Sequence, residues 1–168
     1  MEPVWYALID CAQDPRLLDL VRSCKSHICL FKGRDLDPQL VEAAPWLVRA
    51  DAAEPLLGIW QQHGHGASWG MMLLSDRSIE QLQHHFRRFL QAKLPDGTIA
   101  MFRFYDPRVF NTYLRSATPE ERAPWFDGIV QFSVEGAGGT AMHHYREQDG
   151  RLLDGARVIA SKGVQNAG

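Results

Sequence analysis

Short apolar runs alternate with amphipathic stretches along the chain, a pattern that predicts mixed strands and helices. Residues 4–10 (VWYALID) and 27–31 (HICLF) are apolar and rich in β-forming residues, which is typical of buried strands. Between them, Asp14-Pro15 favours a helix start, and the residues on one face of that helix are Leu17, Leu18, Val21 and Cys24. A strand, a helix and a strand within about thirty residues predict a βαβ unit with a parallel strand pair.

Further strands are predicted at residues 46–48, where Trp46 enters the core, at 69–74, at 98–105 and at 129–134. Residues 61–68 form a polar loop rich in Gly and His. A helix over residues 78–94 begins with a capping box of Ser78 and Gln81 and repeats apolar residues every three or four positions.

Two shorter helices are predicted to follow. One begins at Asp106-Pro107, and the other begins at Thr118-Pro119, where Thr118 and Glu121 form a second capping box. We therefore expect one α/β domain over residues 1–149, with a mixed, mostly parallel sheet of about five strands and packed helices. The pattern fades after Gly150, which predicts a loosely ordered tail over residues 150–168.

The length of 168 residues suits one domain with a real core. Lys and Arg total 18 and Asp and Glu total 20, a net charge of −2 that supplies no basic field for nucleic acid and no polybasic membrane anchor. No run reaches the roughly 18 apolar residues of a membrane span, and the acidic N-terminus does not fit a signal peptide. We expect a cytoplasmic protein without membrane insertion, whose three cysteines are buried free thiols.

The segment FRFYDPRVF, residues 102–110, places three charges inside an apolar run. Asp106 is suited to cap the following helix. Arg103 and Arg108 flank it, and either guanidinium could pair with Asp106 or with another carboxylate such as Asp10. We interpret the cluster as an internal strut. A general acid/base site is the alternative, but it would need a second titrating group and a cleft, which the sequence does not name.

His63-Gly64-His65, in the polar loop, is the most metal-like feature, because histidine is a common zinc ligand. An exposed loop without metal is the simpler interpretation, and a metal-dependent hydrolase is the alternative. We expect no metal and no cofactor.

Aromatic residues offer a different kind of site. Trp60 and Trp125-Phe126 lie beside polar or Pro- and Gly-rich segments, where they either form an exposed patch for a partner or are buried.

The sequence resembles the bacterial family known as domain of unknown function 4123. The resemblance extends over residues 4–134. Its matching segments are YALID at residues 6–10, LFKG at 30–33, PWLV at 45–48, Trp69-Gly70, HFRRFL at 85–90, PDG at 95–97 and FRFYDPR at 102–108. The family usually has His-Leu-Arg where Phe86 stands here in the middle position. Many members also continue into a second, helical C-terminal lobe, so in this chain we expect a two-lobed cleft to be absent or reduced.

The resemblance implies a non-enzymatic cytoplasmic adaptor or chaperone of the Tap/Tec type. Its partners would be a toxic type VI secretion effector and the VgrG and PAAR proteins of the secretion spike. The residues expected to bind the partner or to build the scaffold of the binding surface are Trp46, Trp60, Trp69, Arg103, Asp106, Arg108, Trp125 and Phe126. An immunity protein that neutralises a toxin is a further alternative.

Overall fold

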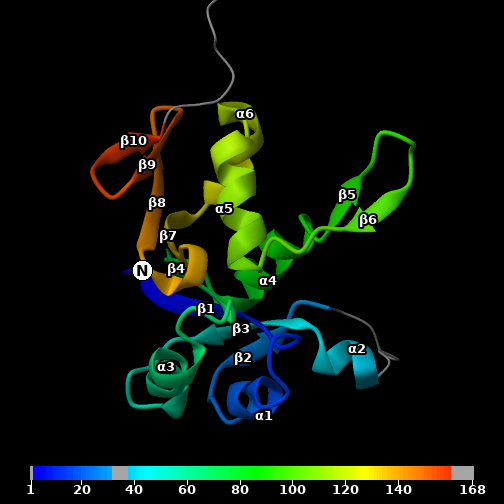
Figure 1. The fold of residues 1–168 in the computed structure, drawn as a ribbon, viewed down its shortest axis with the longest axis vertical. Helices are drawn as coiled ribbons and strands as arrows, with labels where there is room; N and C mark the ends of the chain where they lie inside the picture. Colours follow the sequence, from blue (N-terminus) through cyan, green and yellow to red (C-terminus); the bar gives the residue numbers. More distant parts are fainter. Residues whose placement is uncertain (1, 32–37, 160–168) are drawn as a thin grey trace, which may run out of the picture.

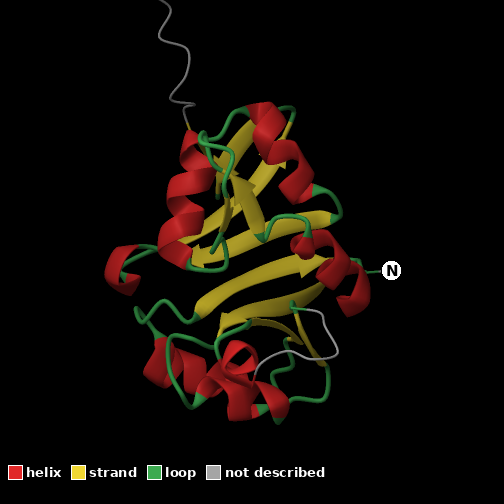
Figure 2. Cartoon of the chain, turned by 90° about the vertical axis from the view of Figure 1, so that its right-hand side faces the viewer, coloured by secondary structure: helices red, strands yellow, loops and turns green. Residues whose placement is uncertain are grey.

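The computed structural model describes residues 2–31 and 38–159, and an eight-stranded sheet runs through this part of the chain (Figures 1 and 2). The strand order is β10-β9-β8-β7-β4-β1-β3-β2. The bounds are β1 (Val4–Asp10), β2 (His27–Cys29), β3 (Pro45–Arg49), β4 (Gly70–Ser75), β7 (Ile129–Glu135), β8 (Met142–Gln148), β9 (Arg151–Asp154) and β10 (Arg157–Ile159). A separate two-stranded ribbon contains β5 (Gln91–Lys93) and β6 (Ile99–Met101).

The prediction of a mostly parallel sheet of about five strands is wrong, because the eight strands pair antiparallel throughout. β1 and β2 do run in the same direction, since both are antiparallel to β3, but β3 lies between them. β3 suits that interior position because it is apolar on both faces: Leu47 belongs to one core cluster and Val48 to the other. Periodicity identifies these strands but carries no information about which strands are neighbours.

Helices pack on the two faces of the sheet. On the first face lie α4 (Ile79–Arg87), α5 (Pro107–Ser116), α6 (Pro119–Arg122) and the 3-10 turn η2 (Ala123–Phe126). On the second face lie α1 (Leu17–Arg22), α3 (Pro55–Ile59) and the π-helix η1 (Trp60–Gly64), with α2 (Pro38–Glu42) nearby. The short turn η3 (Ala137–Gly139) connects β7 to β8.

The first-face core is built around aromatic side chains. Trp125 is buried and stacks on Phe89 with ring centroids 4.0 Å apart, while Phe104 and Phe110 meet it edge-on. Its indole N–H donates to the hydroxyl of Tyr113 at 3.2 Å, so the buried polar atom is satisfied. This cluster joins the helical layer to the sheet.

Helix starts follow the predicted chemistry. Ser78 with Gln81 and Thr118 with Glu121 both form complete capping boxes, and Asp106 accepts a hydrogen bond from the main-chain N–H of Arg108. The helix predicted over residues 78–94 is too long, because α4 ends at Arg87 and β5 begins at residue 91. Phe89 and Leu90 still face the core after the helix ends, so the apolar spacing continues into non-helical backbone.

The loose tail predicted from residue 150 is also wrong over residues 151–159, which form β9 and β10. Leu152 is buried and belongs to the first-face core, and Ile159 packs against that core. These strands have three or four residues each, too short to show a clear alternation in the sequence. The rest of the predicted tail, residues 160–168, lies outside the described residues.

Gly70 tests the close pairing of β4 with β1. A Cβ at this position would collide with the carbonyl oxygen of Leu8 in the neighbouring strand, and backbone in a central strand cannot easily shift. We expect Gly70→Ala to lower the free energy of unfolding by about 1–3 kcal/mol, measured by urea denaturation. Gly58→Ala is the matched control, because it adds the same methyl group to an exposed position of α3 with no atom within 4 Å. The control should raise stability by about 0.5–1 kcal/mol. Equal effects of the two substitutions would contradict the packing described.

His85 predicts how stability depends on pH. Burial lowers the pKa of its imidazole to about 4, and Arg88 donates to Nδ1 at 3.0 Å while Nε2 lies 3.2 Å from the carbonyl oxygen of Trp125. Between about pH 6.5 and 4 the unfolded chain therefore binds a proton that the folded chain does not. Stability should fall by about 2–3 kcal/mol as the pH drops through this window and show no further contribution from His85 below it. Urea unfolding of His85→Gln, measured at a series of pH values, should lack this loss of stability between about pH 6.5 and 4. If the variant loses as much stability as the wild type over this window, His85 is not the group responsible.

Candidate functional site

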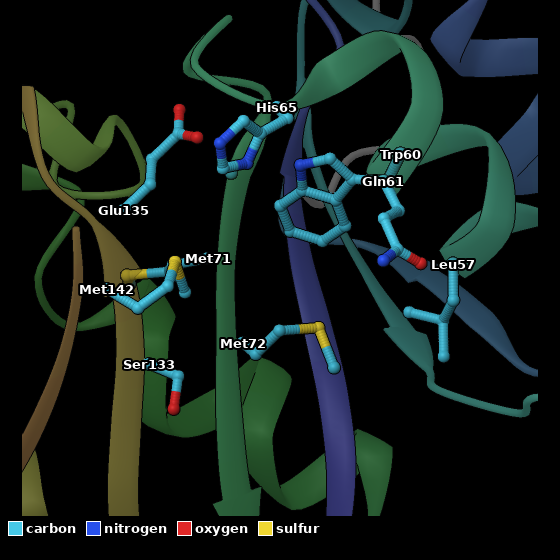
Figure 3. Close-up of a pocket in the computed structure, with 10 residues that line it drawn as sticks. Leu57, Trp60, Gln61, His65, Met71, Met72, Ser133, Glu135 and Met142 are labelled. Atoms are coloured by element: carbon cyan, nitrogen blue, oxygen red, sulfur yellow. The ribbon is translucent and has the colours of Figure 1, made fainter. Parts of the chain in front are cut away.

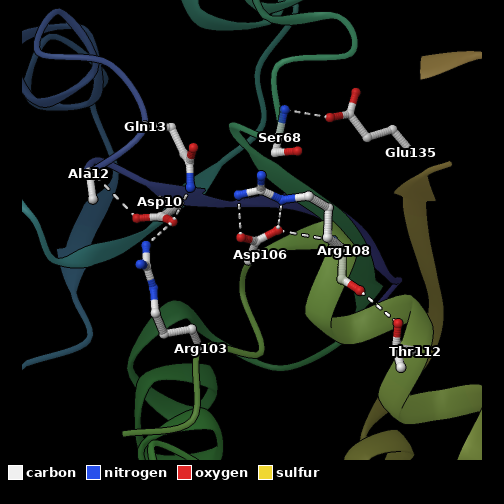
Figure 4. Close-up of polar contacts among 9 residues, drawn as sticks. All are labelled: Asp10, Ala12, Gln13, Ser68, Arg103, Asp106, Arg108, Thr112 and Glu135. Carbon is white, nitrogen blue, oxygen red and sulfur yellow. Dashed lines mark hydrogen bonds and ion pairs between the residues drawn. The ribbon is translucent and has the colours of Figure 1, made fainter. Parts of the chain in front are cut away.

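The charge cluster predicted around residues 102–110 contains two ion pairs near the end of β1 (Figure 4). Asp10, the last residue of β1, is fully buried, and its Oδ2 accepts from Nη2 of Arg103 at 2.7 Å. The carboxylate also accepts from the main-chain N–H of Ala12 at 3.1 Å and from the amide of Gln13 at 2.9 Å. The prediction that Arg103 pairs with a carboxylate such as Asp10 is confirmed.

Asp106 forms the second pair while it caps α5. Its Oδ1 accepts from the main-chain N–H and Nε of Arg108 at 2.9 and 3.0 Å, and its Oδ2 accepts from Nη2 at 2.7 Å. Burial raises the pKa of this carboxyl, but the hydrogen bonds and the positive charge of Arg108 outweigh burial and hold the pKa below its usual value. Asp106 therefore carries its charge at neutral pH.

In both ion pairs the carboxylate is buried and the guanidinium is exposed to solvent. The side chains of Arg103 and Arg108 are 47% and 67% exposed, whereas both carboxylates are buried. The interpretation as an internal strut thus holds for Asp10, whose pair with Arg103 ties the end of β1 to the segment before α5. The Asp106–Arg108 pair is local and caps the start of α5. The guanidinium groups reach the surface, where a partner can contact them.

The predicted aromatic residues divide between the core and the surface. Trp46, Trp69 and Trp125 are buried, so they serve as scaffold. Phe126 is half-buried and meets Phe132 edge-on at 5.3 Å. Trp60, from η1, is half-buried and lines an open groove.

The groove beside Trp60 encloses about 220 Å³ between η1 and strands β4, β7 and β8 (Figure 3). Its apolar lining comes from Leu57, Trp60, Met72 and Met142, and Met71 borders it with its side chain buried in the first-face core. His65, Gln61, Ser133 and Glu135 supply polar atoms. Sequence reasoning missed the three methionines and Glu135. Met71 and Met72 lie in an apolar run that predicts core, and only strand alternation signals that they point to opposite faces.

The groove lies where the helical cover of the second face stops. The second-face core includes Met72 of β4 but no residue of β7 or β8. On those strands the second face instead carries a polar network: Ser133 lies 2.9 Å from Nδ1 of His144, and Arg146 donates to Gln131 at 2.8 Å. The groove is thus bordered by helix on one side and by open sheet on the other.

Glu135 fixes the loop above the groove. Its buried carboxylate accepts from the main-chain N–H groups of Gly66 at 2.8 Å and Ser68 at 2.7 Å. Glu135 also lines a second cavity of about 570 Å³, which is more polar and includes Arg108, Arg115 and His143. An apolar groove and a partly basic cavity therefore meet at one buried carboxylate.

The two histidines of the predicted alternative, a metal site, do not line the same cavity. His65 lines the groove, whereas His63 lines a different depression next to Leu17 and Trp69. Over residues 2–31 and 38–159, no group of three or more His, Cys, Asp or Glu side chains is placed to hold a metal ion. The cysteines are free, and burial raises the pKa of the Cys11 thiol to about 12.

A family model described as a domain of unknown function, DUF4123, matches residues 5–124. The chain belongs to the DUF4123 family. The matched region begins at the second residue of β1 and contains β2 to β6, both ion pairs and Trp60. It ends one residue before Trp125. The resemblance stated from the sequence is therefore confirmed at the level of the family, whose description assigns no function.

Searches of curated proteins and of solved structures gave no match to this DUF4123 chain. Within the described ranges, none of the helices is long and apolar enough to cross a bilayer.

The two ion pairs of this DUF4123 protein predict unequal effects on stability. Arg103→Ala should lower the free energy of unfolding by about 2 kcal/mol, because it leaves the buried Asp10 with only its two remaining donors. Arg108→Ala should cost less than about 1 kcal/mol, since its side chain is mostly exposed and Asp106 keeps its bond to the main chain. Thermal and urea unfolding check both values. Adding Asp10→Asn to Arg103→Ala should restore part of the loss, and a larger loss for Arg108→Ala would contradict the assignment.

Proposed function

We propose that this DUF4123 protein is a cytoplasmic adaptor that binds a type VI secretion effector and assists its loading onto the VgrG/PAAR spike. Family membership supports the proposal through the sequence resemblance, which associates such proteins with effector delivery. The observation that carries it is the open groove lined by Trp60, Met72 and Met142, at the part of the second sheet face, over β7 and β8, that the described part of the chain leaves without helical cover. In this proposal the protein acts by binding and performs no bond-making.

The groove has the chemistry of a protein-binding surface. Methionine side chains are unbranched and polarizable, so they adapt to apolar side chains of different shapes. Trp60 provides a rigid aromatic anchor of the kind that concentrates binding energy at interfaces. Covering the groove removes apolar surface from water, at about 25 cal/mol per Å².

Charged side chains next to the groove favour one orientation of a bound segment. Beyond Glu135, the second cavity includes Arg108, Arg115 and His143, and the Glu135 carboxylate is already engaged by two N–H groups. A partner segment that places apolar side chains in the groove and a carboxylate beside the cavity would therefore meet complementary charge. We assign the effector-binding role to the groove. We assign a positioning role to the Asp10–Arg103 pair, which holds β1 to the segment before α5, and to Asp106, which caps α5.

Met142→Glu tests the groove in cells. Met142 is exposed on β8, so a carboxylate there should spare the core, while it puts an uncompensated charge into the apolar lining. In a strain that lacks the gene, at least one secreted protein should disappear from the secretome. Wild type and Met142→Leu should restore this protein, and Met142→Glu should not.

Leu40→Glu is the matched control, because it makes the same kind of change at an exposed apolar residue of α2, away from the groove. It should restore secretion fully. A secretome that is unchanged by deletion would refute the adaptor function. So would a chain that blocks the toxic activity of a co-encoded protein on simple mixing while being dispensable for secretion, because that behaviour defines an immunity protein.

A further inference from the structure

The β5–β6 ribbon extends away from the rest of the chain and pairs with no other strand in the described part of the structure (Figure 1). Its register pairs Gln91 with Met101, Ala92 with Ala100 and Lys93 with Ile99. An isolated two-stranded ribbon is marginally stable in water, and a third strand or a packed surface normally supports it. The ribbon is therefore incomplete as a sheet.

The hydrogen bonds at its two ends show which main-chain groups are free to accept a further strand. Phe102 N–H donates to the carbonyl of Leu90, and Leu94 N–H donates to the carbonyl of Thr98, both at 2.8 Å. Because antiparallel pairs alternate, the Ala100 N–H and C=O point toward β5. The N–H and C=O groups of Ile99 and Met101 consequently point outward, along the open edge of β6.

The side chains at the two edges differ in a way that favours β6. Ile99 and Met101 point to the same face and are 67% and 53% exposed. The opposite edge, on β5, carries Gln91 and Lys93 on that face. Charged side chains, Lys above all, discourage strand addition at a sheet edge. β5 has this protection and β6 lacks it.

We propose that the outer edge of β6 docks an extended segment of the delivered effector, which adds as a third strand and carries apolar side chains at alternate positions. Main-chain hydrogen bonds to Ile99 and Met101 would hold the segment, and its apolar side chains would cover theirs. The identification of the partner as the effector rests on the proposed function, whereas the docking edge rests on the geometry of the ribbon.

A second copy of the chain is a poorer occupant. Two-fold pairing about Ala100 would engage only Ile99 and Met101 of each chain. A stable interface buries about 800 Å² per partner and involves about 20–30 residues a side, more than the whole ribbon of residues 91–101 contains. An extended segment has no such symmetry constraint.

The test uses the full chain labelled with ¹⁵N and a synthetic peptide of about nine residues that alternates valine and threonine between acidic ends. Binding should slow the solvent exchange of the Ile99 and Met101 amides and leave those of Gln91 and Lys93 unchanged. A peptide with the same side chains but N-methylated at alternate positions cannot pair and should not bind. If the Ile99 and Met101 amide signals stay unchanged up to about 1 mM peptide, the proposal is overturned. Equal binding of the methylated peptide would also overturn it.

Two matched proline variants locate the edge. Ile99→Pro removes an outward donor from β6 and should weaken binding by about fivefold or more, the effect of one lost hydrogen bond. Lys93→Pro makes the same change on the outer edge of β5 and should leave affinity unchanged. Ile99→Lys keeps the main chain intact and gives β6 the protection that β5 has, so it should also weaken binding. Equal losses from Ile99→Pro and Lys93→Pro would refute docking at β6.

The outcomes are independent of the adaptor test. Loss of secretion in Met142→Glu together with no peptide binding would keep the adaptor function and remove the β6 site. If the peptide binds but deletion of the gene leaves the secretome unchanged, the docking edge on β6 stands and the adaptor function is refuted. Concentration-dependent dimerisation that Ile99→Pro abolishes would identify a second copy as the occupant and overturn the proposal.

Discussion

The arrangement of the molecule depends on one buried charge, the carboxylate of Asp10 at the end of β1. β1 lies inside the sheet, between β3 and β4, so a charge at its end must be compensated. The chain does this with two groups just after the strand and with Arg103, which is 93 positions away. That contact fixes the segment between the ribbon and α5. Three residues later Asp106 starts α5, so the positions of the ribbon and of the helix both follow from the Asp10–Arg103 pair.

The uneven helical cover of the sheet leaves exposed the surfaces that we propose for binding. α4, α5 and the aromatic cluster around Trp125 close the first face, whereas α1, α3 and η1 close the second face only over one end of the sheet. The groove lies at the boundary of that second cover, and the ribbon extends from the first-face layer. One chain therefore offers an apolar groove and a strand edge. In the proposed functions these two surfaces select different features of a partner: side-chain shape for the groove and extended main chain for the edge.

Local chemistry in the sequence predicted much of this structure, and contacts between distant residues account for what it missed. The capping boxes and the Asp106 cap depend on residues within three positions of one another, and β1 is a continuous apolar run, so these elements were predicted correctly. The insertion of β3 between β1 and β2 depends on pairing across the sheet, which a linear pattern does not contain. The helix at residues 78–94 was extended too far because Phe89 keeps a core position by stacking on Trp125. The groove was missed because alternation assigns Met72 to a face without showing whether a helix covers that face.

Composition alone also misrepresents the electrostatics of the candidate site. The net charge of −2 predicts a weakly acidic surface, but composition counts charges without regard to burial. Near the groove and the end of β1, the carboxylates of Asp10, Asp106 and Glu135 are buried and each accepts main-chain N–H groups, while the guanidiniums of Arg103 and Arg108 reach solvent. Buried acids hold the loops in place, while the guanidinium groups that pair with Asp10 and Asp106 reach solvent and present N–H donors at the surface. In the proposed function, a partner that carries carboxylates beside apolar anchors accepts hydrogen bonds from these exposed guanidinium groups, a preference that the total charges of the protein do not indicate.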